Sequence, residues 1–260
     1  MAVNRSLWLA HFDASTPPRW PCPACGGSLQ YTTDTLSIRE TKESRLARAH
    51  EDWDPEWTER RFTCVLECSR KECGETVAVV GNEKTSFGWQ GEDEEGETRS
   101  LSPLLAVPMP RVFDVPDKCP PPILIELEKS FALIWLDPAS AANHARAAVE
   151  LLMDYLGVRK VEITKGDRKR KYLSLHRRII LFQKREPALG SALLAVKWIG
   201  NSGSHPSGVQ VLDIFDAYDI LEHALEELIG RRSYSLRRLA TGINRRRTPQ
   251  SKQRARKPLF

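Results

Sequence analysis

Two pairs of closely spaced cysteines constrain the fold of this chain more than any other feature of its 260 residues. Cys22 and Cys25 form a C-x2-C pair, and Cys68 and Cys73 form a C-x4-C pair that Gly74 follows directly. Tight turns of this kind let two thiolates converge on one cation, and four thiolates complete a tetrahedral zinc site. We therefore predict a structural zinc ion bound by these four cysteines, with no position left for water or substrate.

The region around the cysteines is expected to form a zinc ribbon. Alternating segments at residues 62–66 and 76–80 flank the second pair and predict a small hairpin. Cys64 competes with Cys68 as a ligand, but it lies inside the strand pattern and is interpreted as a packed thiol. A long insertion separates the two pairs, and its residues 37–53 predict a solvated helix.

Composition changes sharply after the ribbon. Residues 90–100 are acidic and contain glycine, which predicts a solvated linker. Residues 101–122 contain seven prolines, and prolines at this density predict an extended connector without regular structure. We therefore assign residues 1–100 to a zinc-ribbon-like domain with a helical insertion and residues 101–122 to a Pro-rich connector.

From residue 123 onward the apolar residues recur at helical spacing. Proline, glycine and aspartate mark the ends of the predicted helices. These helices cover residues 122–136, 139–156, 175–183, a stretch that begins at Pro187, and 211–229. Alanines on one face of the second helix predict a close approach by another helix. Short connections predict an antiparallel helical bundle over residues 123–230. The expected fold class is therefore mainly α, with a small β zinc ribbon.

The charge is concentrated at the C-terminal end. The formal net charge is +5, and residues 231–260 carry eleven Lys or Arg with no Asp or Glu, which leaves −6 for residues 1–230. A basic tail of this kind predicts contact with RNA or DNA, and a disordered solubilising tail is the alternative. A short basic helix is expected at residues 234–243.

Membrane insertion and secretion are not expected. No apolar run reaches the roughly 18 residues of a transmembrane helix, and residues 1–15 lack the pattern of a secretory signal. The predicted location is the cytoplasm, where thiols stay reduced and six cysteines favour a metal over a disulfide framework.

A polar burst after Gly200 marks the second candidate site. Asn201 and His205 are four residues apart, Lys197 lies one turn earlier, and His205 is the side chain there that titrates near neutral pH. The alternative is a helix C-terminus whose polar residues cap backbone groups. Arg146 and Glu150 share a helix face, where a surface ion pair is the alternative interpretation.

The order of these features resembles a known family. The cysteine ribbon, the Pro-rich connector, the helix sequence AANHARAAVELLMDYLGV and the I-G-N-x-x-x-H string of residues 199–205 are followed by an Asp-rich amphipathic helix. This order is similar to the HEPN-like "domain of unknown function" family, found alone or fused to restriction-endonuclease subunits in prokaryotes. The resemblance covers residues 20–230 and implies a HEPN-like bundle, a setting in prokaryotic defence, and a homodimer or a defence-system partner protein.

The resemblance also implies a possible reaction, the cleavage of RNA. HEPN domains that cleave RNA use an Arg-x4-6-His motif without a metal, in which His and Arg assist attack by the ribose 2′-hydroxyl. This chain departs from the motif, because no Arg precedes His205 at that spacing and Lys197 is the nearest basic residue. Lysine supplies charge but not the bidentate fork of arginine.

Three functions follow from the sequence. The first is a nucleic-acid-associated zinc-ribbon and HEPN-like module that is non-catalytic or weakly catalytic. The second is a metal-independent endoribonuclease with His205 as general acid or base, and with Lys197 or Arg146 stabilising charge. The third is a protein–protein adaptor whose zinc site is purely structural.

Overall fold

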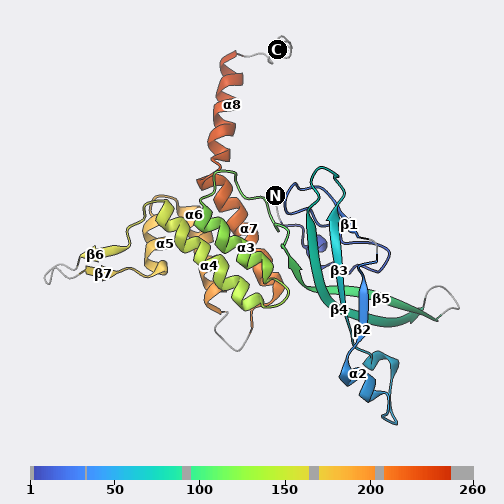
Figure 1. Ribbon diagram of the computed structural model, residues 1–260. Coiled ribbons are helices and arrows are strands. Elements are labelled where there is room, and N and C mark those ends of the chain that lie inside the picture. Colours follow the sequence, from blue (N-terminus) through green and yellow to red (C-terminus); the bar gives the residue numbers. More distant parts are fainter. Residues whose placement is uncertain (1–2, 33, 90–94, 164–169, 203–207, 247–260) are drawn as a thin grey trace.

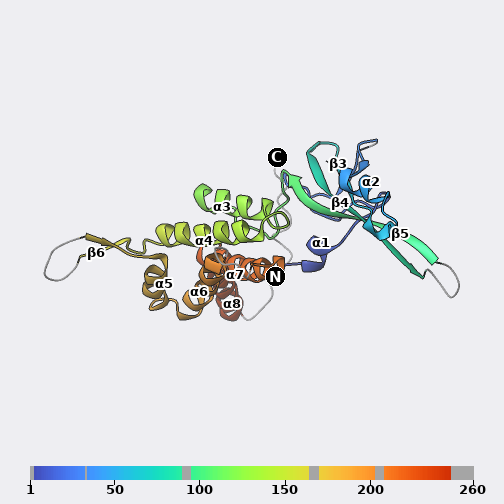
Figure 2. The same cartoon turned by 90° about the horizontal axis from the view of Figure 1, so that it is seen from below.

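A computed structural model describes residues 3–32, 34–89, 95–163, 170–202 and 208–246. The chain forms a sheet domain, residues 29–107, and a helical domain, residues 121–246, which lie side by side (Figure 1). The short helix α1 (Arg5–Leu9) of the N-terminal segment lies between the two domains (Figure 2).

The sheet domain is a five-stranded antiparallel sheet with strand order β1-β3-β4-β5, and β2 also pairs with β3. Its elements are β1 (Leu29–Tyr31), β2 (Ser37–Glu40), α2 (Lys42–Ala47), η1 (Pro55–Trp57), β3 (Arg60–Cys68), β4 (Thr76–Trp89) and β5 (Glu95–Val107). Alternation along β3 explains its place in the sheet, because Phe62, Cys64, Leu66 and Cys68 are buried while Thr63 is exposed.

The prediction of a mainly α chain with an antiparallel HEPN-like bundle and a small β ribbon is wrong. Strands β4 and β5 are 14 and 13 residues long, and they form a long ladder in a curled antiparallel sheet. Residues 95–100, predicted as a solvated linker, and residues 101–107, predicted as connector, both lie in β5. The fold is therefore mixed, with a substantial sheet beside the helices.

The prediction of an irregular connector from its prolines was wrong because β5 lies at the edge of the sheet. An edge strand can hold a proline, since one side of its backbone has no neighbouring strand to receive an N–H. Pro103 pairs with Gly81 where the register between β4 and β5 shifts, and an added Cβ on Gly81 would lie 2.1 Å from the Ser102 carbonyl oxygen. The bulge and the glycine together accommodate Pro103 within the strand.

The predicted helix over residues 37–53 is also wrong at both ends. Residues 37–40 form β2, and the helix α2 covers only residues 42–47. The Thr41 hydroxyl accepts a hydrogen bond from Ser44 N and fixes the start of α2.

The helical domain contains six helices and a two-stranded hairpin within the described residues. Its elements are α3 (Pro121–Ala132), α4 (Pro138–Tyr155), β6 (Val161–Ile163), β7 (Arg170–Tyr172), α5 (Leu175–Gln183), α6 (Pro187–Ser202), α7 (Val211–Leu228) and α8 (Arg232–Arg246). Asp137 caps α4 by accepting from Ser140 N, and Ser174 caps α5 by accepting from Arg177 N. Apolar faces of α3, α4, α5, α6 and α7 form the core of the helical domain, whereas α8 projects away from it (Figure 1).

Candidate functional site

The four predicted cysteines come together where the segment before β1 meets the end of β3. The sulfur atoms of Cys22, Cys25, Cys68 and Cys73 all lie within 4.8 Å of one another. Sγ of Cys22 lies 3.8 Å from that of Cys73, and Sγ of Cys25 lies 3.5 Å from that of Cys68. A tetrahedral zinc site with Zn–S bonds of about 2.3 Å places its sulfurs about 3.8 Å apart. The donor set and its spacing therefore fit a metal ion.

Backbone geometry explains why the first pair converges. Cys22 N donates to Gly27 O at 2.6 Å, and Gly26 N donates to Cys22 O at 2.8 Å, which closes a tight turn. Gly26 has φ +68°, a left-handed conformation that glycine adopts without strain. These two hydrogen bonds close the predicted turn around Cys22 and Cys25 into a knuckle.

The second pair is held in the same way by a turn at the end of β3. Cys68 N donates to Glu75 O at 2.8 Å, and Cys73 N donates to Arg70 O at 2.9 Å. Gly74 follows with φ +61°. The two turns face each other because β1 pairs with β3 so that Leu29 lies opposite Cys68.

Backbone N–H groups also prepare the sulfurs for a cation. Gly27 N donates to Cys25 Sγ at 3.4 Å, and Arg70 N donates to Cys68 Sγ at 3.4 Å. The Gly27 N–H, together with the neighbouring Cys68 thiol, lowers the pKa of Cys25 to about 7. Burial and the neighbouring thiols raise the pKa values of Cys68 and Cys73, so of these three thiols Cys25 is the one that ionises near neutral pH, and the thiolate is the form that binds a metal.

Cys64 lies outside this group of sulfurs. It is buried in β3, and burial raises the pKa of its thiol to about 11. The structure thus brings Cys68, and not Cys64, to the other three cysteines. Four thiolates leave no open position for substrate, so a metal here would stabilise the fold and would not take part in chemistry.

The structure places part of the second predicted site at the crossing of α4 and α6. Gly200 packs directly on α4, where an added Cβ would lie 2.5 Å from Arg146 Cβ and 2.8 Å from Ala142 O. Lys197, one turn earlier on α6, is near enough to Arg146 for the two charges to interact. Asn201 is exposed in the last turn of α6, and His205 lies outside the described residues.

Lys197 of α6 is a charged side chain that is almost fully buried. Only 8% of its surface is exposed, and its Nζ lies 3.3 Å from the centroid of the Trp198 ring. Burial, and next the charge of Arg146, lowers the pKa of Lys197. No hydrogen bond or ion pair to the Lys197 ammonium is present among the described residues. A buried cation beside a second cation favours the approach of an external anion.

Arg146 and Glu150 form the helix-face pair that their spacing predicts. Nη1 of Arg146 lies 3.9 Å from a Glu150 carboxylate oxygen, so the ion pair is long. Nε and Nη2 of Arg146 instead donate to Asn143 Oδ1 at 3.2 and 3.1 Å. The guanidinium is therefore oriented by Asn143 more than by Glu150.

Sequence reasoning missed a carboxylate–histidine pair between α3 and α4. Nδ1 of His144 lies 2.7 Å from a Glu126 carboxylate oxygen, and Lys129 Nζ lies 2.7 Å from the other oxygen. Lys129 and then His144 lower the pKa of Glu126. No local sequence signal identifies this pair, because the register between the two helices decides which residues meet.

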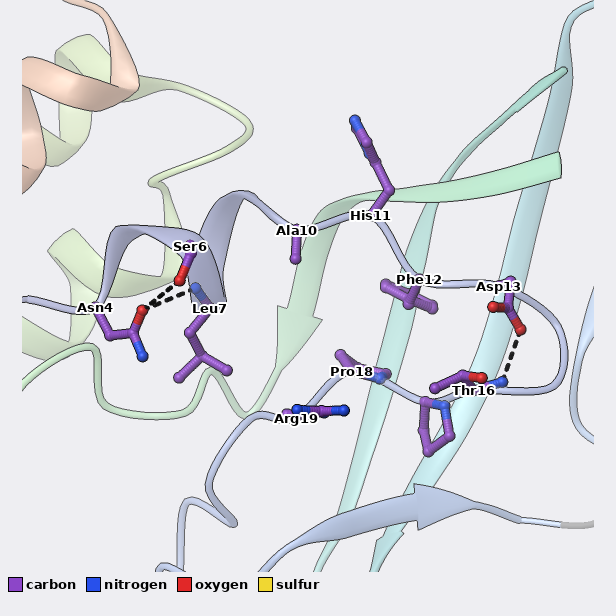
Figure 3. Close-up of a pocket in the computed structure, with 11 residues that line it drawn as sticks. Asn4, Ser6, Leu7, Ala10, His11, Phe12, Asp13, Thr16, Pro18 and Arg19 are labelled. Carbon is purple, nitrogen blue, oxygen red and sulfur yellow. Dashed lines mark hydrogen bonds between the residues drawn. The ribbon is translucent and has the colours of Figure 1, made fainter. Parts of the chain in front are cut away.

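A separate pocket of about 350 Å³ lies on the N-terminal segment. Figure 3 shows α1 on one side and the loop that carries Phe12 and Asp13 on the other. The Asp13 carboxylate already accepts hydrogen bonds from Ser15 and from Thr16 N. The lining of this pocket contains none of the four cysteines, so the pocket is not part of the candidate metal centre.

Two family models match the chain. Residues 10–108 match the family described as "Domain of unknown function (DUF8608)", and residues 128–246 match "Domain of unknown function (DUF4145)". No curated protein and no solved structure matches the chain. The chain therefore contains two domains of unknown function, and neither description names a ligand, an activity or a partner. Of the helices in the described ranges, none combines the length and apolar character that a membrane span requires.

Proposed function

We propose that this protein binds nucleic acid through the basic helix α8, with zinc holding the sheet domain together. The observation that carries the proposal is the separation of charge, since residues 231–260 hold eleven cations and no acidic side chain. We further propose that the protein is located in the cytoplasm, where thiols stay reduced and available to the metal. There it would act together with a partner protein of a prokaryotic defence system.

The shape of α8 supports contact with phosphates. At 3.6 residues per turn, Arg237, Arg238 and Arg245 share one side of the helix. Leu236, Leu239 and Ile243 lie on the opposite side and are exposed. Because α8 projects from the helical domain (Figure 1), its basic side is free to follow a phosphate backbone.

Neutralising this basic side should weaken binding and its dependence on salt. We expect the triple variant Arg237→Gln, Arg238→Gln, Arg245→Gln to bind single-stranded RNA more weakly and to reduce the slope of log Kd against log salt by about 2, at roughly 0.7 per phosphate contact. Fluorescence anisotropy of a labelled oligonucleotide over a salt series measures both quantities.

The matched control removes three exposed cations from the sheet domain, Arg39→Gln, Lys42→Gln and Arg45→Gln. It changes the net charge equally, so an effect of net charge alone would appear in both variants. An equal loss in the two variants would contradict a binding site on α8. Wild-type protein without affinity for RNA or DNA at low salt would favour the protein–protein adaptor.

A second candidate function is a metal-independent endoribonuclease, and the Lys197–Arg146 pair favours it. Two adjacent cations can stabilise the charge that develops on a phosphate during cleavage. In this mechanism His205 acts as general acid or base, and Asn201 lies within the same stretch. The ribose 2′-hydroxyl attacks the adjacent phosphorus and the 5′-oxygen leaves, so one product ends in a cyclic phosphate.

If this second function is correct, wild-type protein cleaves RNA in buffer without added magnesium and His205→Ala does not. We expect a loss of at least about 100-fold in rate, the usual contribution of a general acid or base. His223→Ala, an exposed histidine on α7, serves as the control and should keep full activity. Cleavage that survives in His205→Ala, or products without cyclic phosphate ends, would rule this mechanism out.

A further inference from the structure

Three tryptophans meet where the helical domain contacts the rest of the chain. Trp20 stacks on Trp8 of α1, with ring centroids 6.1 Å apart and an interplanar angle of 19°. It stacks more closely on Trp135, which lies in the turn between α3 and α4, at 5.1 Å and 27°. Trp135 Nε1 also donates to Trp8 O at 3.0 Å. The Trp20 ring thus contacts both the N-terminal segment and the helical domain.

Trp20 also adjoins the candidate metal centre. Only Pro21 separates it from Cys22, and Pro21 pairs with Ser28 across the first knuckle. The turn that brings Cys22 to the other sulfurs therefore fixes the backbone from which the Trp20 ring extends. The ring is 1% exposed, and its Nε1 has no hydrogen-bond acceptor among the described residues. Ring packing, rather than a hydrogen bond, holds Trp20 in place.

Polar contacts also join the N-terminal segment to α7, among them a hydrogen bond from Val3 N to Asp219 Oδ1. Arg5 Nη2 lies 2.6 Å from an Asp216 oxygen and 2.7 Å from an Asp219 oxygen, where Asp216 is exposed and the side chains of Arg5 and Asp219 are partly exposed. Exposed ion pairs contribute about 0 to 1 kcal/mol each. Stacked, buried indoles contribute more, through both their buried area and their ring geometry. The tryptophan cluster therefore supplies the buried aromatic part of this contact.

We infer that metal binding by the four cysteines and docking of the helical domain are thermodynamically coupled through Trp20. A metal bound by all four sulfurs would hold the first knuckle against the turn of the second cysteine pair, and the knuckle held there presents Trp20 between Trp8 and Trp135. Coupling of this kind is reciprocal, so a docked helical domain must in turn raise the affinity of the cysteines for the metal. This inference concerns the zinc site and the domain contact, and it does not depend on nucleic-acid binding.

The reciprocal effect gives a direct test in the full-length protein. Trp135→Ala changes a residue of the helical domain that does not belong to the group of four cysteines. We expect it to weaken zinc affinity by about 5-fold or more, at the lower end of ordinary coupling between sites. Competition with a chromophoric zinc chelator under reducing conditions measures the affinity.

Trp198→Ala is the matched control, because Trp198 is exposed on α6 of the same domain and lies outside the cluster. It should leave zinc affinity at the wild-type value. Trp135→Phe retains a ring and should give an intermediate affinity, with the helical far-UV circular dichroism unchanged in all three variants. Wild-type zinc affinity in Trp135→Ala would overturn the inference.

The forward effect can be measured on the wild-type chain. Removing zinc with a chelator should abolish the near-UV circular dichroism of the stacked indoles and increase the radius of gyration measured by X-ray scattering. Adding zinc back in the presence of a reductant should restore both values. A metal-free chain that keeps the near-UV signal and the radius of the zinc-bound chain would equally overturn the coupling.

Discussion

Cys22→Ser is expected to abolish zinc binding and to unfold the sheet domain at temperatures where the wild-type domain is folded. Three thiolates cannot complete the tetrahedral site, and the free energy of binding a structural zinc is free energy of folding. In zinc-finger peptides this binding is worth about 10–16 kcal/mol. The sheet domain has its own buried core, so we expect it to lose several kcal/mol rather than its entire stability. Zinc content and differential scanning calorimetry measure the two effects.

Cys64→Ser separates loss of the metal from damage to the core. Cys64 is buried in β3 but does not belong to the sulfur group. A serine hydroxyl buried there without a partner should cost about 1–3 kcal/mol. The zinc content should nevertheless stay at the wild-type value. A Cys22→Ser protein with normal zinc content, or a Cys64→Ser protein without zinc, would contradict the assignment of these four ligands.

The cysteine site was predictable from sequence because its geometry is local. Each pair closes a turn of fewer than ten residues, and Gly26 and Gly74 supply the left-handed conformations that the turns require. Which cysteine of β3 joins the group was not decided by the sequence, because Cys64 and Cys68 lie on the same face of the strand and only the position of Cys68 at the strand end favoured it. The meeting of two turns more than 40 residues apart followed from the expectation that both would bind one cation.

The helices were predictable for a similar reason, and the long strands were not. The predicted ranges lie close to α3, α4, α5, α6 and α7, since caps such as Asp137 and Ser174 mark the helix starts in the sequence. Strand β5 carries acidic residues and one proline, Pro103, which locally disfavour a strand. It forms through pairing with β4, which includes the bulge at Gly81, and such pairing depends on distant residues.

The second candidate site was only partly accessible from sequence. The alanines of α4 predicted that another helix approaches closely, and the structure places Gly200 of α6 against Ala142. Lys197 is buried without an acidic partner among the described residues. This burial depends on how α4 and α6 cross and on the position of the Trp198 ring, and no pattern in the sequence specifies either one. The same holds for the tryptophan cluster, whose members come from three separate segments.

Gly200→Ala is expected to destabilise the helical domain by about 1–3 kcal/mol, the usual cost of adding a methyl group to a fully packed contact. The new Cβ would lie 2.5 Å from Arg146 Cβ and 2.8 Å from the Ala142 carbonyl oxygen, so α6 must move away from α4. Backbone atoms cannot yield as the end of a flexible side chain can. Urea denaturation followed by far-UV circular dichroism measures the change in the free energy of unfolding.

Gly242→Ala is the same type of substitution, but it is expected to increase the free energy of unfolding. Gly242 lies within α8, and an added Cβ there meets nothing within 4 Å. Replacing a helical glycine by alanine without a clash stabilises the helix by about 0.5–1 kcal/mol. Both substitutions remove the same backbone entropy from the unfolded chain, so the difference between them isolates the steric contact of α6 with α4. If both variants were stabilised equally, the two helices could not cross as closely as Gly200 implies, and the juxtaposition of Lys197 with Arg146 would lose its structural basis.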